Sequence, residues 1–203
     1  MHKVQAIAVR PSTHFETISA VAIASNVMFA AADQTSEPWR SWLNSDYTKN
    51  VRSIRRPAEL TRVEAMDAAT ARFTSGRATA FAFEPLPYAD FPQPLKKLQV
   101  TGLDLPRSDS SFTVVGPIKP LVAINSNLTM STGKTAAQVA HGLMLWLREQ
   151  DEATMNLWKM RPCLRMRVAP LETLEQPGVT VIDNGHTELE PHTATVRVAL
   201  AAG

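Results

Sequence analysis

Three polar side chains share one face of a predicted helix in the second half of the chain. Lys134, Gln138 and His141 stand at positions i, i+4 and i+7, a spacing that aligns side chains along an α-helix. Ser131 or Thr132 is a suitable N-cap residue, because a short hydroxyl there accepts from free backbone N–H groups. A lysine beside the positive end of a helix favours an anionic ligand. The simpler interpretation is an ordinary solvated helix face.

A second polar group follows an apolar strand near the C-terminus. The run Asp183-Asn184-Gly185 contains the Asn-Gly signal of a tight hairpin, so Asp183 can be a turn residue. A turn at the end of a strand can also lift Asp183 and the following His186 and Thr187 toward the start of the lysine-bearing helix. The two roles of Asp183 are compatible.

Two common kinds of site are excluded by the residues present. The word Thr132-Gly133-Lys134-Thr135 suggests a phosphate-binding P-loop, but Leu128 stands where that loop requires a glycine. Cys163 is the single cysteine, and the five histidines show no metal-ligand spacing. We therefore expect neither a metal site nor a cofactor.

The two polar groups lie in stretches that resemble the peptidyl-tRNA hydrolase 2 family. Residues 127–141, NLTMSTGKTAAQVAH, are similar to its opening motif D-L-K-M-G-K-G-K-x-A-A-Q-x-x-H. Residues 179–195, VTVIDNGHTELEPHTAT, are similar to its I-x-D-A-G-x-T-Q/E-I-x-P-G-S/T-x-T. A third stretch, VTGLDL at 100–105, resembles the strand that closes a family domain, although it precedes the opening motif.

The resemblance implies an esterase that cleaves the bond between peptide and tRNA. Such a reaction needs an oriented water, a stabilised oxyanion and a held phosphate-rich substrate. Asp183 or His141 would orient the water, since an unperturbed histidine has a pKa near 6.5, and the base is not assigned. Lys134 and free N–H groups around Gly133 would hold phosphate or the oxyanion. The implied catalytic residues are His141, Asp183 and Thr187, and the implied substrate-binding residues are Lys134, Gln138, Gly133, Thr195, Arg165 and Arg167.

Departures from the family motifs keep a second function open. Thr129 and Thr132 replace two family lysines, His192 replaces a glycine, and the terminal G-I-G-P is absent. A catalytically degenerate binding or scaffold protein of the same fold is the alternative.

Basic residues outside these motifs suggest a surface for tRNA phosphates. Arg165 and Arg167 alternate onto one face of a predicted strand. Together with Arg161 and with Arg52, Arg55 and Arg56 they predict a stripe along the substrate. A strand edge protected by charge is the equally simple alternative.

The order of predicted elements in the first half repeats in the second. A shift of 116 residues places Ala6–Ala8 on Val122–Ile124, Trp42 on Trp158 and Thr79 on Thr195. With a further gap of three residues, Arg52 falls on Arg165 and Pro57 on Pro170. This predicts a diverged tandem repeat; the alternative is a single α/β domain with chance periodicity.

The repeat and the resemblance together predict an α/β fold of two similar units that form an internal pseudo-dimer. Each unit is expected to have a mixed, mostly four-stranded sheet flanked by helices, with domains at residues 1–107 and 117–203. The shift places Ile18, Ala22 and Ser25 on the three polar helix positions, so the first unit should be structural. A monomer and a homodimer are both compatible with this arrangement.

Composition and hydropathy favour a cytoplasmic globular protein. Of the 203 residues, 44% are hydrophobic and 20% are charged, which is ordinary for globular chains. The net charge of +2 permits an anionic partner such as tRNA. The apolar run Ile18–Ala32 ends like a signal-peptide cleavage site, but the repeat predicts that it is a helix of the mature protein. Nothing approaches the ~18 apolar residues of a membrane span.

Overall fold

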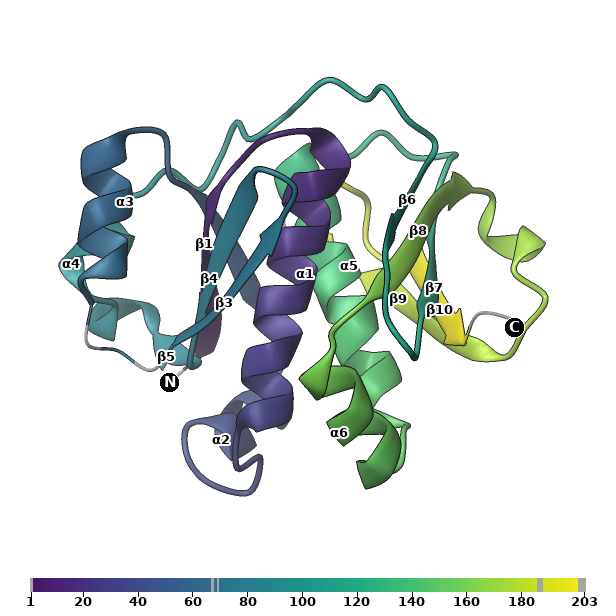
Figure 1. Cartoon of the computed structure of the whole chain (residues 1–203), viewed down its shortest axis with the longest axis horizontal. Helices are drawn as coiled ribbons and strands as arrows, with labels where there is room; N and C mark the ends of the chain where they lie inside the picture. Colours follow the sequence, from purple (N-terminus) through teal and green to yellow (C-terminus); the bar gives the residue numbers. More distant parts are fainter. Residues whose placement is uncertain (1, 67, 69, 186–187, 201–203) are drawn as a thin grey trace.

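Two β-sheets stand on either side of a central pair of helices in the computed structural model, which describes residues 2–66, 68, 70–185 and 188–200 (Figure 1). The helix pair consists of α1 (His14–Ala31) and α5 (Thr132–Arg148). Apolar side chains of both helices and of both inner sheet faces form one continuous hydrophobic core. The chain is therefore an α/β protein whose two halves share their principal core.

The first sheet is mixed and belongs to the first half of the chain. Its order is β2-β1-β4-β3, with β5 attached to β1, and only β1 and β2 run parallel. The bounds are β1 (Lys3–Arg10), β2 (Lys49–Ser53), β3 (Thr70–Ser75), β4 (Ala78–Phe83) and β5 (Leu86–Pro87). Short helices complete this half: α2 (Trp39–Leu43), α3 (Pro57–Glu64), η1 (Tyr88–Asp90) and α4 (Gln93–Lys96).

The second sheet has the same core order. Its strands run β6-β8-β7-β10-β9, and only β7 and β8 are parallel. The bounds are β6 (Ser111–Val114), β7 (Pro120–Asn125), β8 (Leu164–Ala169), β9 (Gly178–Asp183) and β10 (Thr193–Leu200). The helices α6 (Glu152–Met160) and η2 (Leu171–Thr173) flank β8 along the chain.

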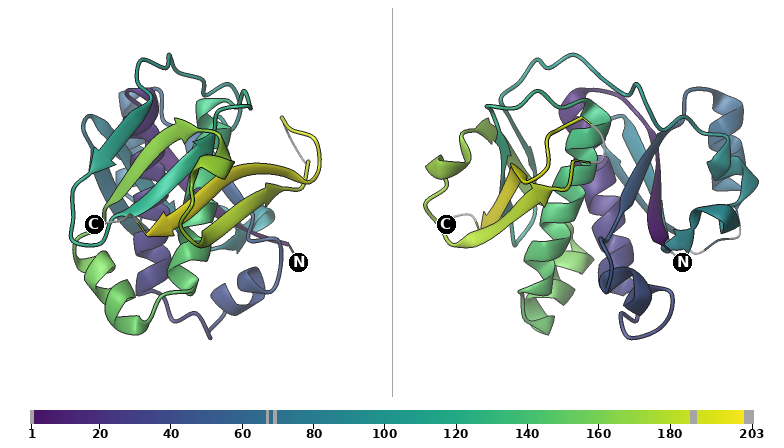
Figure 2. Two further views of the ribbon diagram at one scale, coloured as in Figure 1. Left: turned by 90° about the vertical axis from the view of Figure 1, so that its right-hand side faces the viewer. Right: turned by 180° about the vertical axis from the view of Figure 1, so that it is seen from behind.

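The shared order β2-β1-β4-β3 and β8-β7-β10-β9 confirms the prediction of two similar α/β units (Figure 2). It also confirms that β2 and β8 occupy equivalent places. Each sheet has five strands rather than four, because β5 is added to the shared four-strand order in the first sheet and β6 in the second. β6 is notable because it comes from the connection between the units and pairs with β8.

Equivalent tryptophans anchor the short helix of each unit. Trp42 in α2 and Trp158 in α6 are both fully buried. The indole of Trp42 donates to the carbonyl of Thr48 at 3.1 Å, and that of Trp158 donates to the carbonyl of Cys163 at 2.8 Å. Each bond ties a helix to the chain that leads into the parallel strand, so the pairing of these residues from sequence has a structural basis.

The sequence shift of 116 residues is nevertheless wrong within the strands. Ala6 faces the outer cluster of the first sheet, whereas Val122 faces the helix pair. A displacement of one residue moves every side chain of a strand to the opposite face. Thr79 likewise neighbours the helix-facing Ala78 and Ala80 and points outward, while Thr195 is buried at an irregularity in β10.

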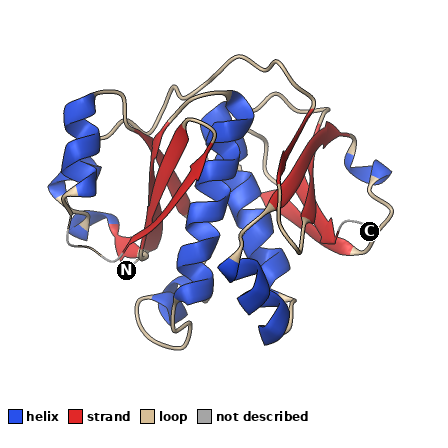
Figure 3. Ribbon diagram, viewed as in Figure 1, coloured by secondary structure: helices blue, strands red, loops and turns tan. Residues whose placement is uncertain are grey.

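The apolar run at 18–32 is a folded helix, as predicted. Helix α1 begins after Thr13, whose hydroxyl accepts from the N–H of Glu16. Its apolar residues are buried on several sides because it lies between the first sheet and α5 (Figure 3). Asn26 donates to the carbonyl of Ala140 at 2.9 Å and so joins the two helices. Among the described helices, none is long and apolar enough to cross a membrane.

Residues 99–107, here called the strap, depart from the expected closing strand. Apart from one bridge between Ser53 and Gln99, the strap pairs with no strand in the described part of the chain. It continues instead to the N-terminus of α5, where the carbonyl of Leu103 accepts from Gly133. The first half of the chain thus reaches into the second unit.

Candidate functional site

A cleft of about 550 Å³ lies between the two units. Helix α5 lines it with the polar face predicted from sequence, and the end of β9 supplies Asp183. The opposite wall comes from the first unit, through residues 46–51 and the strap residues 100–103. The predicted site residues Lys134, Gln138, His141 and Asp183 therefore come together in one cleft.

Asp183 is the centre of a buried polar network. It is 5% exposed, and its Oδ2 accepts from the ammonium of Lys134 and from Gln138 Nε2 at 2.6 Å. Its Oδ1 accepts from the N–H of Gly185 at 2.9 Å. Burial opposes the negative charge, but the hydrogen bonds from Lys134 and Gly185 outweigh it, so the pKa of Asp183 is lowered. Asp183 is an ionised carboxylate at neutral pH.

Thr195 sets the orientation of the Gln138 amide. Its hydroxyl donates to Gln138 Oε1 at 2.9 Å, which leaves the amide NH₂ to face Asp183. The hydroxyl points inward because Thr195 occupies the register shift between Ala194 and Val196 in β10. Thr195 is fully buried and supports the site without lining the cleft.

His141 lies two turns after Lys134 on α5. Its ring packs edge-on against Tyr47, with 5.5 Å between the ring centroids. Burial and the nearby Lys49 lower the pKa of His141 to about 4, although Asp183 acts in the opposite direction. The imidazole is therefore neutral at pH 7. The expectation of an ordinary histidine pKa is wrong because the first unit covers this face of α5.

The backbone at the start of α5 is already occupied. Gly133 lines the cleft, but its N–H donates to Leu103 at 2.9 Å. The N–H of Thr132 donates to Asp104 at 3.2 Å, and that of Lys134 to the Ser131 hydroxyl at 3.2 Å. The expected free N–H groups around Gly133 are not available for an anion, because the strap caps the helix.

The turn after Asp183 is described only in part. Gly185 has a φ of +75°, and its N–H closes a local turn on the Asp183 side chain. The tight hairpin predicted from the Asn-Gly signal is wrong, because the strand partner of Asp183 is Thr193, ten positions further along the chain. The proposed roles of His186 and Thr187 lie outside the described residues.

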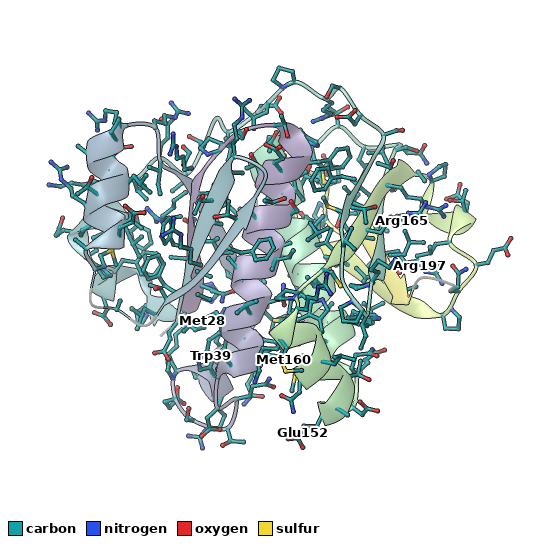
Figure 4. All side chains as sticks on the ribbon, viewed as in Figure 1. Met28, Trp39, Glu152, Met160, Arg165 and Arg197 are labelled. Carbon is teal, nitrogen blue, oxygen red and sulfur yellow. The ribbon has the colours of Figure 1, made fainter. Side chains whose placement is uncertain are left out.

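The arginines do not form one stripe. Leu164 and Met166 face the helix pair, so the alternating Arg165 and Arg167 face outward from the second sheet. Figure 4 shows Arg165 over this sheet, on the side of the molecule away from the first sheet. Arg52 is fully buried on the outer face of the first sheet, where it donates to Leu95 at 2.9 Å.

The helix pair separates the two groups of arginines, so the predicted stripe is wrong. A protected edge is also wrong for Arg165 and Arg167, because β8 lies between β6 and β7. Arg165 and Arg167 are absent from the cleft lining. A contact between them and a substrate in the cleft would require the substrate to pass around the second unit.

Sequence reasoning missed the cleft wall from the first unit. Tyr47 has a φ of +44°, which is unusual for an aromatic residue, and it contacts His141. Lys49 contacts Gln5 at 2.8 Å and Ser25 at 3.2 Å, and burial lowers the pKa of Lys49 to about 7. No motif marks these residues, since their role depends on how the halves pack.

No protein-family model, curated protein or solved structure matches this chain. In the part of the chain that is described, no group of three His, Cys, Asp or Glu side chains could hold a metal ion.

Proposed function

We propose that the chain hydrolyses the ester bond between peptide and tRNA in peptidyl-tRNA. One observation carries the proposal: two stretches that resemble the peptidyl-tRNA hydrolase 2 motifs meet in one cleft. Lys134 and Gln138 come from the first stretch, and Asp183 and Thr195 come from the second. A substrate of this kind would place the protein in the cytoplasm.

The residues suggest orientation of water rather than strong base catalysis. Asp183 has a lowered pKa, so it accepts a hydrogen bond from water better than it removes a proton. The water oxygen attacks the ester carbonyl carbon and the bond from that carbon to the ribose oxygen breaks. The departing ribose oxygen takes up the proton that the water loses and becomes a hydroxyl. Lys134 would stabilise the negative charge on the carbonyl oxygen during this step.

His141 would act as a neutral hydrogen-bonding group. A pKa of about 4 leaves little imidazolium at pH 7, so His141 cannot supply a positive charge. Its place beside Tyr47 suits it to position the substrate or the water.

A specific observation favours the alternative of a degenerate binding protein. Both carboxylate oxygens of Asp183 already accept hydrogen bonds, and the strap caps the start of α5. A site that is this fully satisfied can be structural. The alternative keeps the cleft as a binding surface and assigns it no chemistry.

Single-turnover cleavage of a labelled peptidyl-tRNA by the pure chain separates the two functions. Wild type should cleave, and Asp183→Asn should lose about 10²–10⁴-fold in rate, the usual contribution of a positioned acid or base. Ser75→Ala is a matched control, because Ser75 ends β3 as Asp183 ends β9. No cleavage by wild type would favour the binding protein, and equal cleavage by Asp183→Asn would remove Asp183 from the mechanism.

A further inference from the structure

A second hollow, of about 480 Å³, lies at the carboxyl ends of the parallel strands β1 and β2. Arg10 ends β1, and Arg55 and Arg56 follow β2, so three exposed arginines line it. The ends of the strands are held together by the bond from Ile54 N–H to the Val9 carbonyl at 2.7 Å. In open α/β sheets, ligands bind in the crevice beyond these strand ends.

The charge of this arginine hollow is only partly neutralised. Glu59 pairs with Arg56 at 2.6 Å and accepts from the backbone N–H groups of Arg55 and Arg56. Among the described residues, no carboxylate pairs with Arg10 or Arg55. Two guanidinium groups thus remain for an anion, beside an apolar floor of Ile54 and Leu60.

The strap connects the arginine hollow to the candidate site. Arg55 donates to the carbonyl of Gly102 at 3.3 Å, and Gly102 lines the cleft that holds Lys134 and Asp183. A chain molecule with one end in the cleft can therefore cross the strap and reach Arg55. A small anion bound in the hollow alone would make no use of this connection.

The corresponding strand ends of the second unit carry different residues. Its parallel strands end at Asn125 and Ala169, and Pro170 follows, so no arginine stands at these strand ends. The arginines are therefore not a shared requirement of the repeated fold. They belong to the unit that lacks the polar network around Asp183.

We propose that the arginine hollow binds phosphodiester groups of an RNA strand whose 3′ end enters the cleft. This inference rests on the proposed function and extends it by naming where the polynucleotide lies. The contacts would be to phosphates, which give affinity without base specificity.

Fluorescence anisotropy of the full chain with a labelled RNA hairpin that has a single-stranded 3′ end tests the inference. Each phosphate contact contributes about 0.7–0.9 to the slope of log affinity against log salt. Arg10→Gln/Arg55→Gln should therefore reduce the slope by about 1.5 and the affinity at low salt by about tenfold. The matched control is Arg40→Gln/Arg62→Gln, which removes two exposed arginines outside the hollow.

The outcomes are distinct from those of the cleavage assay. An unchanged slope in Arg10→Gln/Arg55→Gln, or an equal loss in the control variant, would overturn the inference even if wild type cleaves peptidyl-tRNA. A selective loss of RNA affinity without any cleavage by wild type would support the hollow and remove the proposed hydrolysis. Unchanged RNA affinity with lost binding of inorganic phosphate, measured by calorimetry, would overturn the RNA assignment in favour of a free anion.

Discussion

The two units differ where the strand β3 or its equivalent β9 ends beside the central helix of its unit, a place here called the corner. In the second unit, Asp183 ends β9 and accepts from Lys134 and Gln138. In the first unit, Ser75 ends β3, and its hydroxyl hydrogen bonds with that of Ser19 at 2.7 Å. One corner holds an ion pair beside a cleft, and the other holds two neutral hydroxyls.

The first corner is also filled. Glu16 lies against the turn after β3, where its carboxylate accepts from the N–H of Arg77 at 3.4 Å. A Cβ added at Gly76 would lie 2.0 Å from Glu16 Oε1, and Gly76 has a φ of +54°. The turn therefore packs directly against the Glu16 side chain.

The caps of the central helices show which residues correspond. Thr13 caps α1 and Ser131 caps α5, so Glu16 and Lys134 each hold the third position of their helix. The fold is thus the same, while the charge at this position is reversed. The comparison teaches that one scaffold can hold an ion pair beside a cleft in one unit and a glutamate against a tight turn in the other.

The largest expected effect tests whether the units share their anchors. Trp42→Ala and Trp158→Ala should each lower the free energy of unfolding by about 3–5 kcal/mol, because each removes a fully buried indole. Urea denaturation measures both. Leu157→Ala, on the exposed side of α6, is the control and should cost far less. A small cost at one tryptophan alone would break the equivalence of α2 and α6.

The next effect concerns the ion pair that distinguishes the corners. Lys134→Met should cost about 3 kcal/mol of stability at pH 7, because it leaves a buried carboxylate without its cation. The pKa of Asp183 is lowered in the folded protein, so its stabilisation exists above the ordinary carboxyl pKa and is lost as pH falls through the lower value. The difference between wild type and variant should therefore shrink in acid.

Glu16→Gln is the matched change in the first corner. Glu16 has no ion-pair partner among the described residues, so this variant should cost less than Lys134→Met. Urea denaturation at pH 7 and pH 3 provides the comparison. Equal costs at pH 7 would show that the two corners do not differ in the way the structure indicates.

The smallest expected effect is on the pH dependence of stability, and it compares equivalent positions of the two central helices. The position of His141 corresponds to Ile23 of α1, counted from the caps. The pKa of His141 is about 4 in the folded protein. As pH falls below about 6.5, this histidine therefore takes up a proton in the unfolded chain while it stays neutral in the folded one. Wild type should therefore lose about 2 kcal/mol of stability between pH 7 and pH 5 through this group.

His141→Leu should remove this component of the pH dependence. His2→Leu is the control, because it removes an exposed histidine that does not line the cleft. Denaturation curves at pH 7 and pH 5 for the three proteins give the result. If His141→Leu keeps the full wild-type slope, the imidazole is not held neutral by the first unit.

Local signals in the sequence were sufficient for the two central helices and for much of the candidate site. The spacing of Lys134, Gln138 and His141 placed them on one face of a capped helix, and the apolar run before Asp183 placed that residue at the end of a strand. The order of elements was enough to predict two similar units. These features depend on residues within a few positions of one another, and such interactions leave a readable pattern.

Only the tertiary structure decided which groups are available in the cleft. The N–H of Gly133 is taken by Leu103, thirty positions away, and the pKa of His141 is lowered by burial and by Lys49 of the other unit. The helix pair likewise set Arg52 and Arg165 on opposite sides of the molecule. Contacts between distant parts of a chain have no local periodicity or turn signal, so packing alone could determine them.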